Sequence, residues 1–154
     1  MSAELTITPV ENESEWTHVR AIRRRVFIDE QDCPPEEEWD GLDETSRHVL
    51  GTVGGEPVAT ARWRTVPYDE ALAAKLERFA VLPSYRGQGF GRQLVRYVLH
   101  DAHRAGFDRF VLHAQAHLEA FYASFGFERV GEPFVEAGIP HVKMVKHGVA
   151  PEAA

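Results

Sequence analysis

Three glycines and an arginine stand between a strand-like run and an amphipathic stretch. Residues 86–91 read Arg-Gly-Gln-Gly-Phe-Gly, directly after the apolar residues 79–83 and before a segment with helical spacing of apolar residues. Glycine lets the backbone approach a ligand closely and adopt positive φ where the chain must curl. The N-terminus of a helix presents unpaired N–H groups and a partial positive charge. The segment therefore predicts a strand–loop–helix unit whose backbone amides hold a phosphate group.

Composition and charge limit the class of protein and its partners. The chain has 154 residues, enough for one domain with a sizeable core, and its formal net charge of −7 argues against a nucleic-acid partner. Cys33 is the single cysteine, which excludes an intrachain disulfide and favours a reducing compartment. We find neither a signal peptide nor an apolar run long enough to span a membrane. We therefore expect a cytoplasmic protein with one domain at residues 1–146 and a loose tail at 147–154.

The order of the predicted elements indicates a mixed α/β sheet with helices on its faces. Asn12 and Glu15 form the pattern of a capping box before a first helix, which the prolines after Cys33 end. A second helix follows the glycines and stops at Gly106, and a third covers about residues 118–125. Strand–helix–strand passages imply parallel neighbours, and hairpins imply antiparallel ones. Strands are expected at about residues 5–8, 48–53, 58–64, 75–82, 110–112, 127–135 and 140–146.

Two stretches allow more than one interpretation. Residues 69–74 have helical propensity but also suit a loop that leads into the next strand. The first helix carries four arginines, followed about one turn later by acidic residues. We interpret the arginines as a solvated helix face with i,i+4 ion pairs such as Arg25 with Asp29. The four arginines are Arg20, Arg23, Arg24 and Arg25.

The glycine loop does not match two common phosphate-binding motifs. A P-loop needs Gly-x-x-x-x-Gly-Lys followed by Ser or Thr, whereas Gly91 precedes Arg92 and Gln93. A dinucleotide fingerprint counted from Gly87 reaches Arg92 where it needs a third glycine. That fingerprint also belongs to a first βαβ unit, whereas this loop lies past the middle of the chain. The P-loop is excluded, and the dinucleotide site is disfavoured.

Two regions agree with a third kind of phosphate loop. The motif Arg86-x-x-Gly89-x-Gly91 follows the run Ala-Val-Leu-Pro at 80–83, and residues 120–127 read Ala-Phe-Tyr-Ala-Ser-Phe-Gly-Phe. In sequence, spacing and order, these regions resemble the GCN5-related N-acetyltransferase (GNAT) superfamily over nearly the whole chain. Segments at 26–31, 39–43 and 138–141 are similar to a bacterial branch of that superfamily with ElaA-like and YjcF-like proteins.

The resemblance implies a fold, a donor and an acceptor. The fold is a GNAT-like, partly splayed mixed sheet of about seven strands with about four helices. The donor is acetyl-CoA or another acyl-CoA, and the acceptor is an amine of a small molecule or protein that attacks directly. Gln115 departs from the asparagine common in the superfamily, while Arg92 and Val81 also suit a surface position and a core position. The implied cofactor-binding residues are Ala80, Val81, Arg86, Gly87, Gln88, Gly89, Phe90, Gly91, Arg92 and Gln115.

Amine acylation needs a base for the ammonium and a hydrogen-bond donor for the leaving thiolate. The resemblance implies that Tyr122 is the donor, and the alternative is an aromatic side chain that packs beside Phe121 and Phe125. Glu77 is the candidate base, because strand alternation places it on the face that leads into the site. The alternative for Glu77 is a solvated carboxylate or a partner of Arg78.

The acceptor side is less specified by the sequence. His141 follows a Gly-Ile-Pro turn and is a candidate to contact the acceptor, although a lone histidine also suits a structural or exposed place. Glu30, Gln31 and the acidic residues 36–44 are further candidates to line the acceptor pocket. A homodimer formed through the C-terminal strands is an open alternative for the assembly.

Other chemistries find little support. The histidines lack paired spacing with cysteine or carboxylate for a metal site, and no Gly-x-Ser-x-Gly marks a serine hydrolase. Cys33 has no neighbouring histidine in sequence, so a nucleophilic role would depend on the fold. The function that the resemblance implies is therefore an N-acyltransferase, and the alternative is a CoA-binding module for sensing or assembly without turnover.

Overall fold

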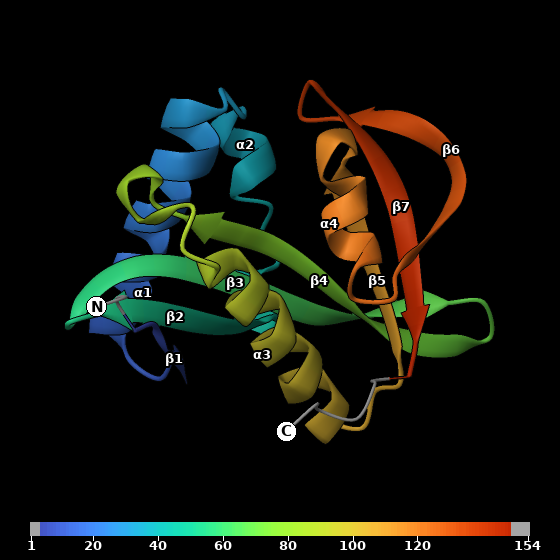
Figure 1. Ribbon diagram of the computed structural model, residues 1–154, viewed down its shortest axis with the longest axis horizontal. Coiled ribbons are helices and arrows are strands. Elements are labelled where there is room, and N and C mark those ends of the chain that lie inside the picture. The colour runs from blue at the N-terminus through green and yellow to red at the C-terminus, as the bar shows by residue number, and fades with distance from the viewer. Residues whose placement is uncertain (1–3, 149–154) are drawn as a thin grey trace.

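The structure is a computed structural model that describes residues 4–148. Its strands form one seven-stranded sheet in the order β1-β2-β3-β4-β5-β7-β6, which confirms the predicted mixed fold (Figure 1). A π-helical segment, Arg24–Glu30, continues the first helix. The helices are α1 (Glu13–Arg23), α2 (Pro35–Glu38), α3 (Phe90–Arg104) and α4 (Glu119–Ala123). The strands are β1 (Thr6–Pro9), β2 (Arg47–Val53), β3 (Glu56–Tyr68), β4 (Ala71–Val81), β5 (Arg109–Gln115), β6 (Glu128–Glu136) and β7 (Ile139–His147).

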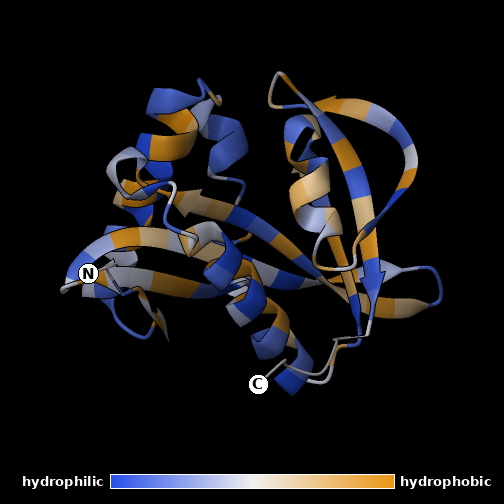
Figure 2. Ribbon diagram, in the orientation of Figure 1, coloured by the Kyte–Doolittle hydropathy of each residue, from blue (hydrophilic) through white to orange (hydrophobic). Residues whose placement is uncertain are grey.

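Helices cover both faces of the sheet. Successive residues of a strand point to opposite faces, and here both faces carry apolar side chains that pack against helices. On β2, Val49 belongs to the cluster around α3, whereas Leu50 belongs to the cluster around α1. Along β7, bands of hydrophobic and hydrophilic residues follow one another (Figure 2). Asn12 caps α1, since its side chain accepts a hydrogen bond of 2.9 Å from the Glu15 N–H. Within residues 4–148, no helix has the length and apolar character to cross a membrane.

The sheet divides between β4 and β5, the parallel neighbours at its centre. These strands pair only at Ala74 with Phe110 and at Lys75 with Val111. Beyond these residues they diverge, while β5 stays paired with β7 along its full length (Figure 1). Past Lys75, the side of β4 that faces β5 therefore has no strand partner, which leaves backbone N–H and C=O groups on that side available to a ligand. This divergence confirms the predicted partly splayed sheet.

The structure decides one ambiguous stretch of β4 and corrects one prediction about the same strand. Residues 71–74 belong to the strand and not to a helix, because Ala73 and Ala74 are fully buried in the sheet and this packing outweighs helix propensity. The predicted alternation also fails within the strand. Arg78 has a φ of 60°, and the register against β3 shifts there, so a β-bulge re-aims the residues after Glu77.

The C-terminal strand extends one residue beyond its predicted end. His147 pairs with Arg109 on β5, and the Gly148 N–H donates to the Asp108 carbonyl at 2.6 Å. The remainder of the predicted tail, residues 149–154, lies outside the described residues.

Candidate active site

The glycine loop forms an open backbone cradle at the start of α3. Gly87 and Gly89 have φ angles of 81° and 82°, a region that L side chains rarely adopt. Gly89 is the N-cap of α3 and supplies no side-chain cap to the first turn of the helix. A Cβ added at Gly87 or Gly89 would meet no atom within 4 Å, so the space above the loop is free of protein. These residues fit a phosphate group, which would accept hydrogen bonds from the amides.

Arg86, predicted to bind the pyrophosphate, is engaged within the protein. Its Nη1 and Nη2 donate to the two carboxylate oxygens of Glu30 at 2.5 and 2.7 Å, and its Nε donates to the Val81 carbonyl at 2.9 Å. The hydrogen bonds from Arg86 lower the pKa of Glu30. Glu30 thus ties the end of the π-helical segment to the loop and is not among the residues that line the neighbouring cavity.

Arg92, on the first turn of α3, lies against α4. Its Nη2 donates to the Ser124 hydroxyl at 3.1 Å, and its guanidinium lies over the rings of Phe121 and Phe125 at 5.5 and 4.8 Å. The side chain of Phe90 is buried in the core, which leaves only its backbone for a ligand. Arg92 therefore fixes α4 beside the loop and keeps a positive charge next to it.

A cavity of about 410 Å³ lies at the divergence of β4 and β5. It brings together Glu77, Tyr122, Gln31, Gln115 and His141, residues that the sequence analysis selected from distant segments. The Gln115 Nε2 donates to the Gln31 Oε1 at 3.1 Å and so connects β5 to the segment after α1. The cavity has a mixed lining of charged, amide and aromatic side chains, which suits a polar acceptor.

Tyr122 belongs to both the core and the cavity. Only 7% of the residue is exposed, and its ring lies against Phe79, Phe121 and Phe127 at centroid distances of 6.2, 5.1 and 6.3 Å. Burial raises the pKa of the hydroxyl, because the phenolate would lose its solvation. Tyr122 therefore stays protonated at neutral pH and is available as a hydrogen-bond donor.

Glu77 lines the cavity within a group of cations. Arg62, Arg64 and Lys75 all form ion pairs with its carboxylate, with the Arg62 Nε at 2.7 Å. Burial alone would raise the pKa of Glu77, but the charge of Arg62 and the hydrogen bond from Arg64 outweigh it and lower the pKa to about 2. Such a carboxylate has little affinity for a proton at neutral pH and is poorly suited to act as a general base.

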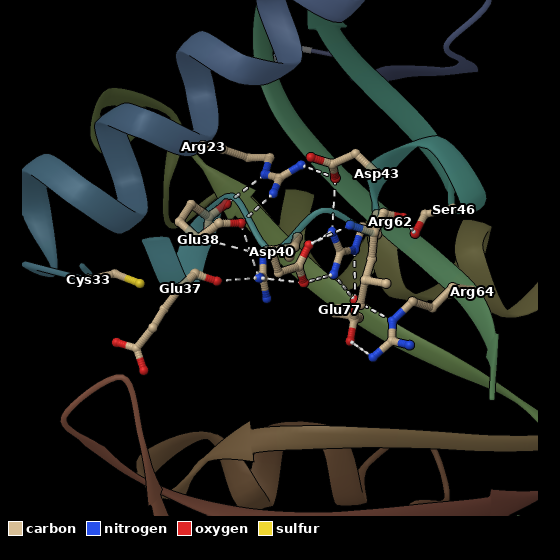
Figure 3. A network of polar contacts seen from close by, with 12 residues as sticks. Arg23, Cys33, Glu37, Glu38, Asp40, Asp43, Ser46, Arg62, Arg64 and Glu77 are labelled. Carbon is tan, nitrogen blue, oxygen red and sulfur yellow. Dashed lines mark hydrogen bonds and ion pairs between the residues drawn. The ribbon is translucent and has the colours of Figure 1, made fainter. Parts of the chain in front are cut away.

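The ion pairs around Glu77 continue into a buried network (Figure 3). Arg62 also donates to Asp40 at 2.6 Å and to Asp43 at 2.8 Å, and its side chain is 1% exposed. Arg23 donates to Glu38 and to Asp43 at 2.6 Å each. Glu38, Asp40 and Asp43 of the acidic segment 36–44 are therefore partners of buried arginines, and Glu37, Glu38 and Asp40 also line the cavity.

The interpretation of Arg23 as part of a solvated helix face is wrong. The residue has no exposed surface, and its guanidinium reaches Glu38 at the end of α2 and Asp43 in the following loop. A buried guanidinium is stable only with charged partners, and Glu38 and Asp43 supply them. The excess of acidic residues at 36–44 is the one sequence signal that pointed to such partners, since Arg23 precedes them by only 13 to 21 positions.

The remaining candidates lie at the walls of the cavity. His141 is 7% exposed, and its Nδ1 lies 2.7 Å from the Ile139 carbonyl at the start of β7. Cys33 also lines the cavity, where burial and the nearby Glu38 raise the pKa of its thiol. A thiol with a raised pKa is a weak nucleophile, which disfavours a covalent role for Cys33.

The network gives an expected pH dependence of stability. The lowered pKa of Glu77 means that its ionised form stabilises the fold above about pH 4.5, and this contribution disappears as the pH falls toward 2. We expect the free energy of unfolding to lose about 3 kcal/mol from this group over that range. Urea unfolding at a series of pH values measures the loss. Glu77→Gln should show a smaller acid loss, and an equal loss in both proteins would contradict the assignment.

Comparison with known proteins agrees with this geometry. The family model of the acetyltransferase (GNAT) domain matches residues 18–147. The chain is 36% identical over 136 residues to the uncharacterized N-acetyltransferase YjcF of Bacillus subtilis, a match that covers 88% of this chain and 94% of YjcF. It is 39% identical over 127 residues to ElaA of Escherichia coli, which covers 81% of this chain and 82% of ElaA.

Solved structures give the same result. The crystal structure of an acyl-CoA N-acyltransferase from Pseudomonas aeruginosa superimposes with a TM-score of 0.81 at 32% identity, over 94% of this chain and 99% of that one. The crystal structure of Escherichia coli ElaA gives a TM-score of 0.80 at 34% identity with the same coverage. The chain therefore belongs to the GCN5-related N-acetyltransferase family, in the branch that contains ElaA and YjcF.

Proposed function

We propose that this protein transfers the acetyl group of acetyl-CoA to a primary amine of a small molecule or protein by direct attack. The observation that carries the proposal is the position of the open amide cradle beside the divergence of β4 and β5. The cradle suits the pyrophosphate of CoA, and the diverging edge of β4 suits the pantetheine arm that follows the pyrophosphate. The cavity beyond them supplies space for an acceptor.

The donor site uses mainly backbone groups. The amides of residues 87–92 hold the pyrophosphate at the N-terminus of α3, with Arg92 nearby and Arg86 available once it releases Glu30. The amides of pantetheine pair with the unpaired edge of β4 near Ala80 and Val81, as a peptide adds to a sheet edge. Gln115, which lines the cavity from β5, contacts the cofactor in this proposal. This arrangement presents the thioester to the cavity.

The acceptor reacts in the cavity. Its nitrogen attacks the thioester carbonyl carbon, and the C–S bond breaks as the thiolate leaves. Tyr122 donates its hydroxyl proton to this sulfur, and Gln31 and His141 contact the acceptor. Glu77 holds Arg62, Arg64 and Lys75 in place through ion pairs, and we assign it this electrostatic role rather than proton transfer.

An assay of thiol release tests the proposal. Purified protein is incubated with acetyl-CoA and a panel of small amines and lysine peptides, and the products are identified by mass spectrometry. We expect amine-dependent release of CoA with formation of an N-acetyl product. Tight CoA binding without turnover on any amine would favour a CoA-binding module for sensing or assembly instead.

Replacing Tyr122 with phenylalanine tests the donor to sulfur. The change removes one hydroxyl and leaves the aromatic packing against Phe79 and Phe127. We expect kcat to fall about 100-fold with little change in the Kd for CoA, because general acid catalysis contributes about 10²- to 10⁴-fold. Tyr97→Phe, on α3 outside the cavity lining, is the control and should keep full activity. Unchanged turnover in Tyr122→Phe would exclude the role.

A further inference from the structure

A histidine and a carboxylate meet on the wall of the cavity opposite β4. His113 on β5 and Glu136 at the end of β6 both line the cavity, and the His113 Nδ1 lies 3.0 Å from the Glu136 Oε1. The ring of Phe134 contacts His113 edge-on at a centroid distance of 5.0 Å. The imidazole is thus held from two sides, by a hydrogen bond and by an aromatic ring. The two residues are 23 positions apart and belong to no motif selected from the sequence.

The hydrogen bond determines the tautomer of His113. An ionised carboxylate only accepts hydrogen bonds, so Nδ1 carries the proton and donates it to Glu136. In the neutral ring, Nε2 then holds the lone pair. Among the described residues, no hydrogen bond or ion pair to Nε2 is found, and 25% of the side chain is exposed. His113 therefore offers an unblocked proton acceptor at the cavity.

The other proton acceptors of the cavity are less suitable. Glu77 is engaged by three cations. The Nε2 of His141 lies 3.8 Å from the Glu136 Oε2, so it faces this carboxylate, and its ring stacks on Phe134 with a side chain only 9% exposed. Of the two described histidines that line the cavity, His113 is the one whose Nε2 has no hydrogen bond or ion pair to another described residue.

We propose that His113 is the general base that deprotonates the acceptor ammonium, and that Glu136 is the positioning residue that fixes its tautomer. The inference rests on the proposed amine acylation and supplies the base which that reaction needs. The hydrogen bond from His113 also lowers the pKa of Glu136, which keeps this carboxylate ionised. The charged or titratable groups that surround His113 from the neighbouring strands are Arg64, Lys75, Glu77, Glu136, His141 and Lys143.

The proton balance of the step is complete. His113 Nε2 accepts one proton from the ammonium and passes it to solvent at the exposed side of the cavity. The amine forms the N–C bond with the thioester carbon, and the C–S bond breaks. The sulfur takes the proton of Tyr122, and the second nitrogen proton restores the tyrosine. The products are the amide, CoA with a free thiol, and one proton in solution.

Replacing His113 with glutamine tests the base. We expect kcat/KM for the amine to fall about 100- to 1000-fold at neutral pH with an unchanged Kd for CoA. As the pH rises, kcat/KM of the wild type should reach a plateau, whereas kcat/KM of the variant should keep rising with the fraction of free amine. His18→Gln, at an exposed position on α1, is the matched control and should match the wild type. A wild-type rate and pH profile in His113→Gln, or loss of its CoA binding, would overturn the proposal.

Replacing Glu136 with glutamine tests the positioning role. In ¹⁵N spectra of the wild type at neutral pH, we expect a protonated Nδ1 and an unprotonated Nε2 for His113. The variant should show a mixture of tautomers, with kcat/KM lowered about 10-fold. An unchanged ring spectrum would overturn the role of Glu136, and a protonated Nε2 in the wild type would overturn the base. This readout needs no turnover, so failure of the proposed function would be recognised separately, by a wild type that acetylates no amine.

Discussion

Gly89→Val is expected to raise the Kd for CoA at least about 100-fold. Gly89 has a φ of 82°, and its would-be Cβ points into the open space where the pyrophosphate lies in the proposed complex. A branched side chain there strains the backbone and occupies the cradle, and a loss of about 2.8 kcal/mol corresponds to this change in Kd. Isothermal titration of CoA into both proteins measures it.

A matched control separates the backbone strain of the substitution from its effect on the CoA site. Gly55, in the turn between β2 and β3, has a φ of 84° and an equally open Cβ position, but it lies outside the glycine loop. Gly55→Val should therefore cost similar stability and leave CoA affinity unchanged. If Gly89→Val bound CoA as the wild type does, the loop would not be the pyrophosphate site.

Arg62→Leu is expected to lower the free energy of unfolding by about 3–5 kcal/mol. The substitution leaves Asp40, Asp43 and Glu77 partly or largely buried and without their shared cation. Removing one partner of a buried ion network is costly because the remaining charges lose compensation without regaining water. Urea denaturation followed by circular dichroism measures the change.

An exposed arginine serves as the control for the loss of a buried one. Arg20 lies on the exposed side of α1, and Arg20→Leu should change the free energy of unfolding by less than about 0.5 kcal/mol. A loss of similar size in both variants, or a loss below 1 kcal/mol for Arg62→Leu, would show that the network contributes little to stability.

The sequence identified the parts of the site that depend on local pattern. The loop at Gly87 and Gly89 could be predicted because the strand before it, its glycines and the start of the next helix follow one another directly in the chain. The order of strands and helices followed from periodicity and turn residues, which are also local. Tyr122 came from a family motif, since helical spacing alone also fits an ordinary core position.

Contacts between residues that are far apart in the sequence could not be predicted in this way. Arg23 sits on a helix beside three other arginines, and only the fold shows that it alone among them is buried. Glu30 and Arg86 are 56 positions apart, and their ion pair depends on how the end of the first helical segment meets the loop. The pair of His113 and Glu136 likewise arises from strand order, because β7 lies between β5 and β6.

The strand β4 shows why local propensity failed in one place. Ala73 and Ala74 favour a helix in isolation, yet their small side chains fit a fully buried position at the centre of the sheet. The bulge at Arg78 then breaks the alternation that a regular strand would have. Both features concern the segment that would present the donor, so regular strand rules could not locate the side chains around it.

The most direct test of the donor site compares CoA with pantetheine, which lacks the pyrophosphate, by isothermal titration. The glycine loop at α3 predicts one CoA per chain and an affinity for pantetheine at least about 100-fold weaker, because charge-assisted hydrogen bonds to the phosphates contribute about 1.5–3 kcal/mol each. Absence of CoA binding, or equal affinity for the two ligands, would contradict the assignment of the loop and the transferase function built on it.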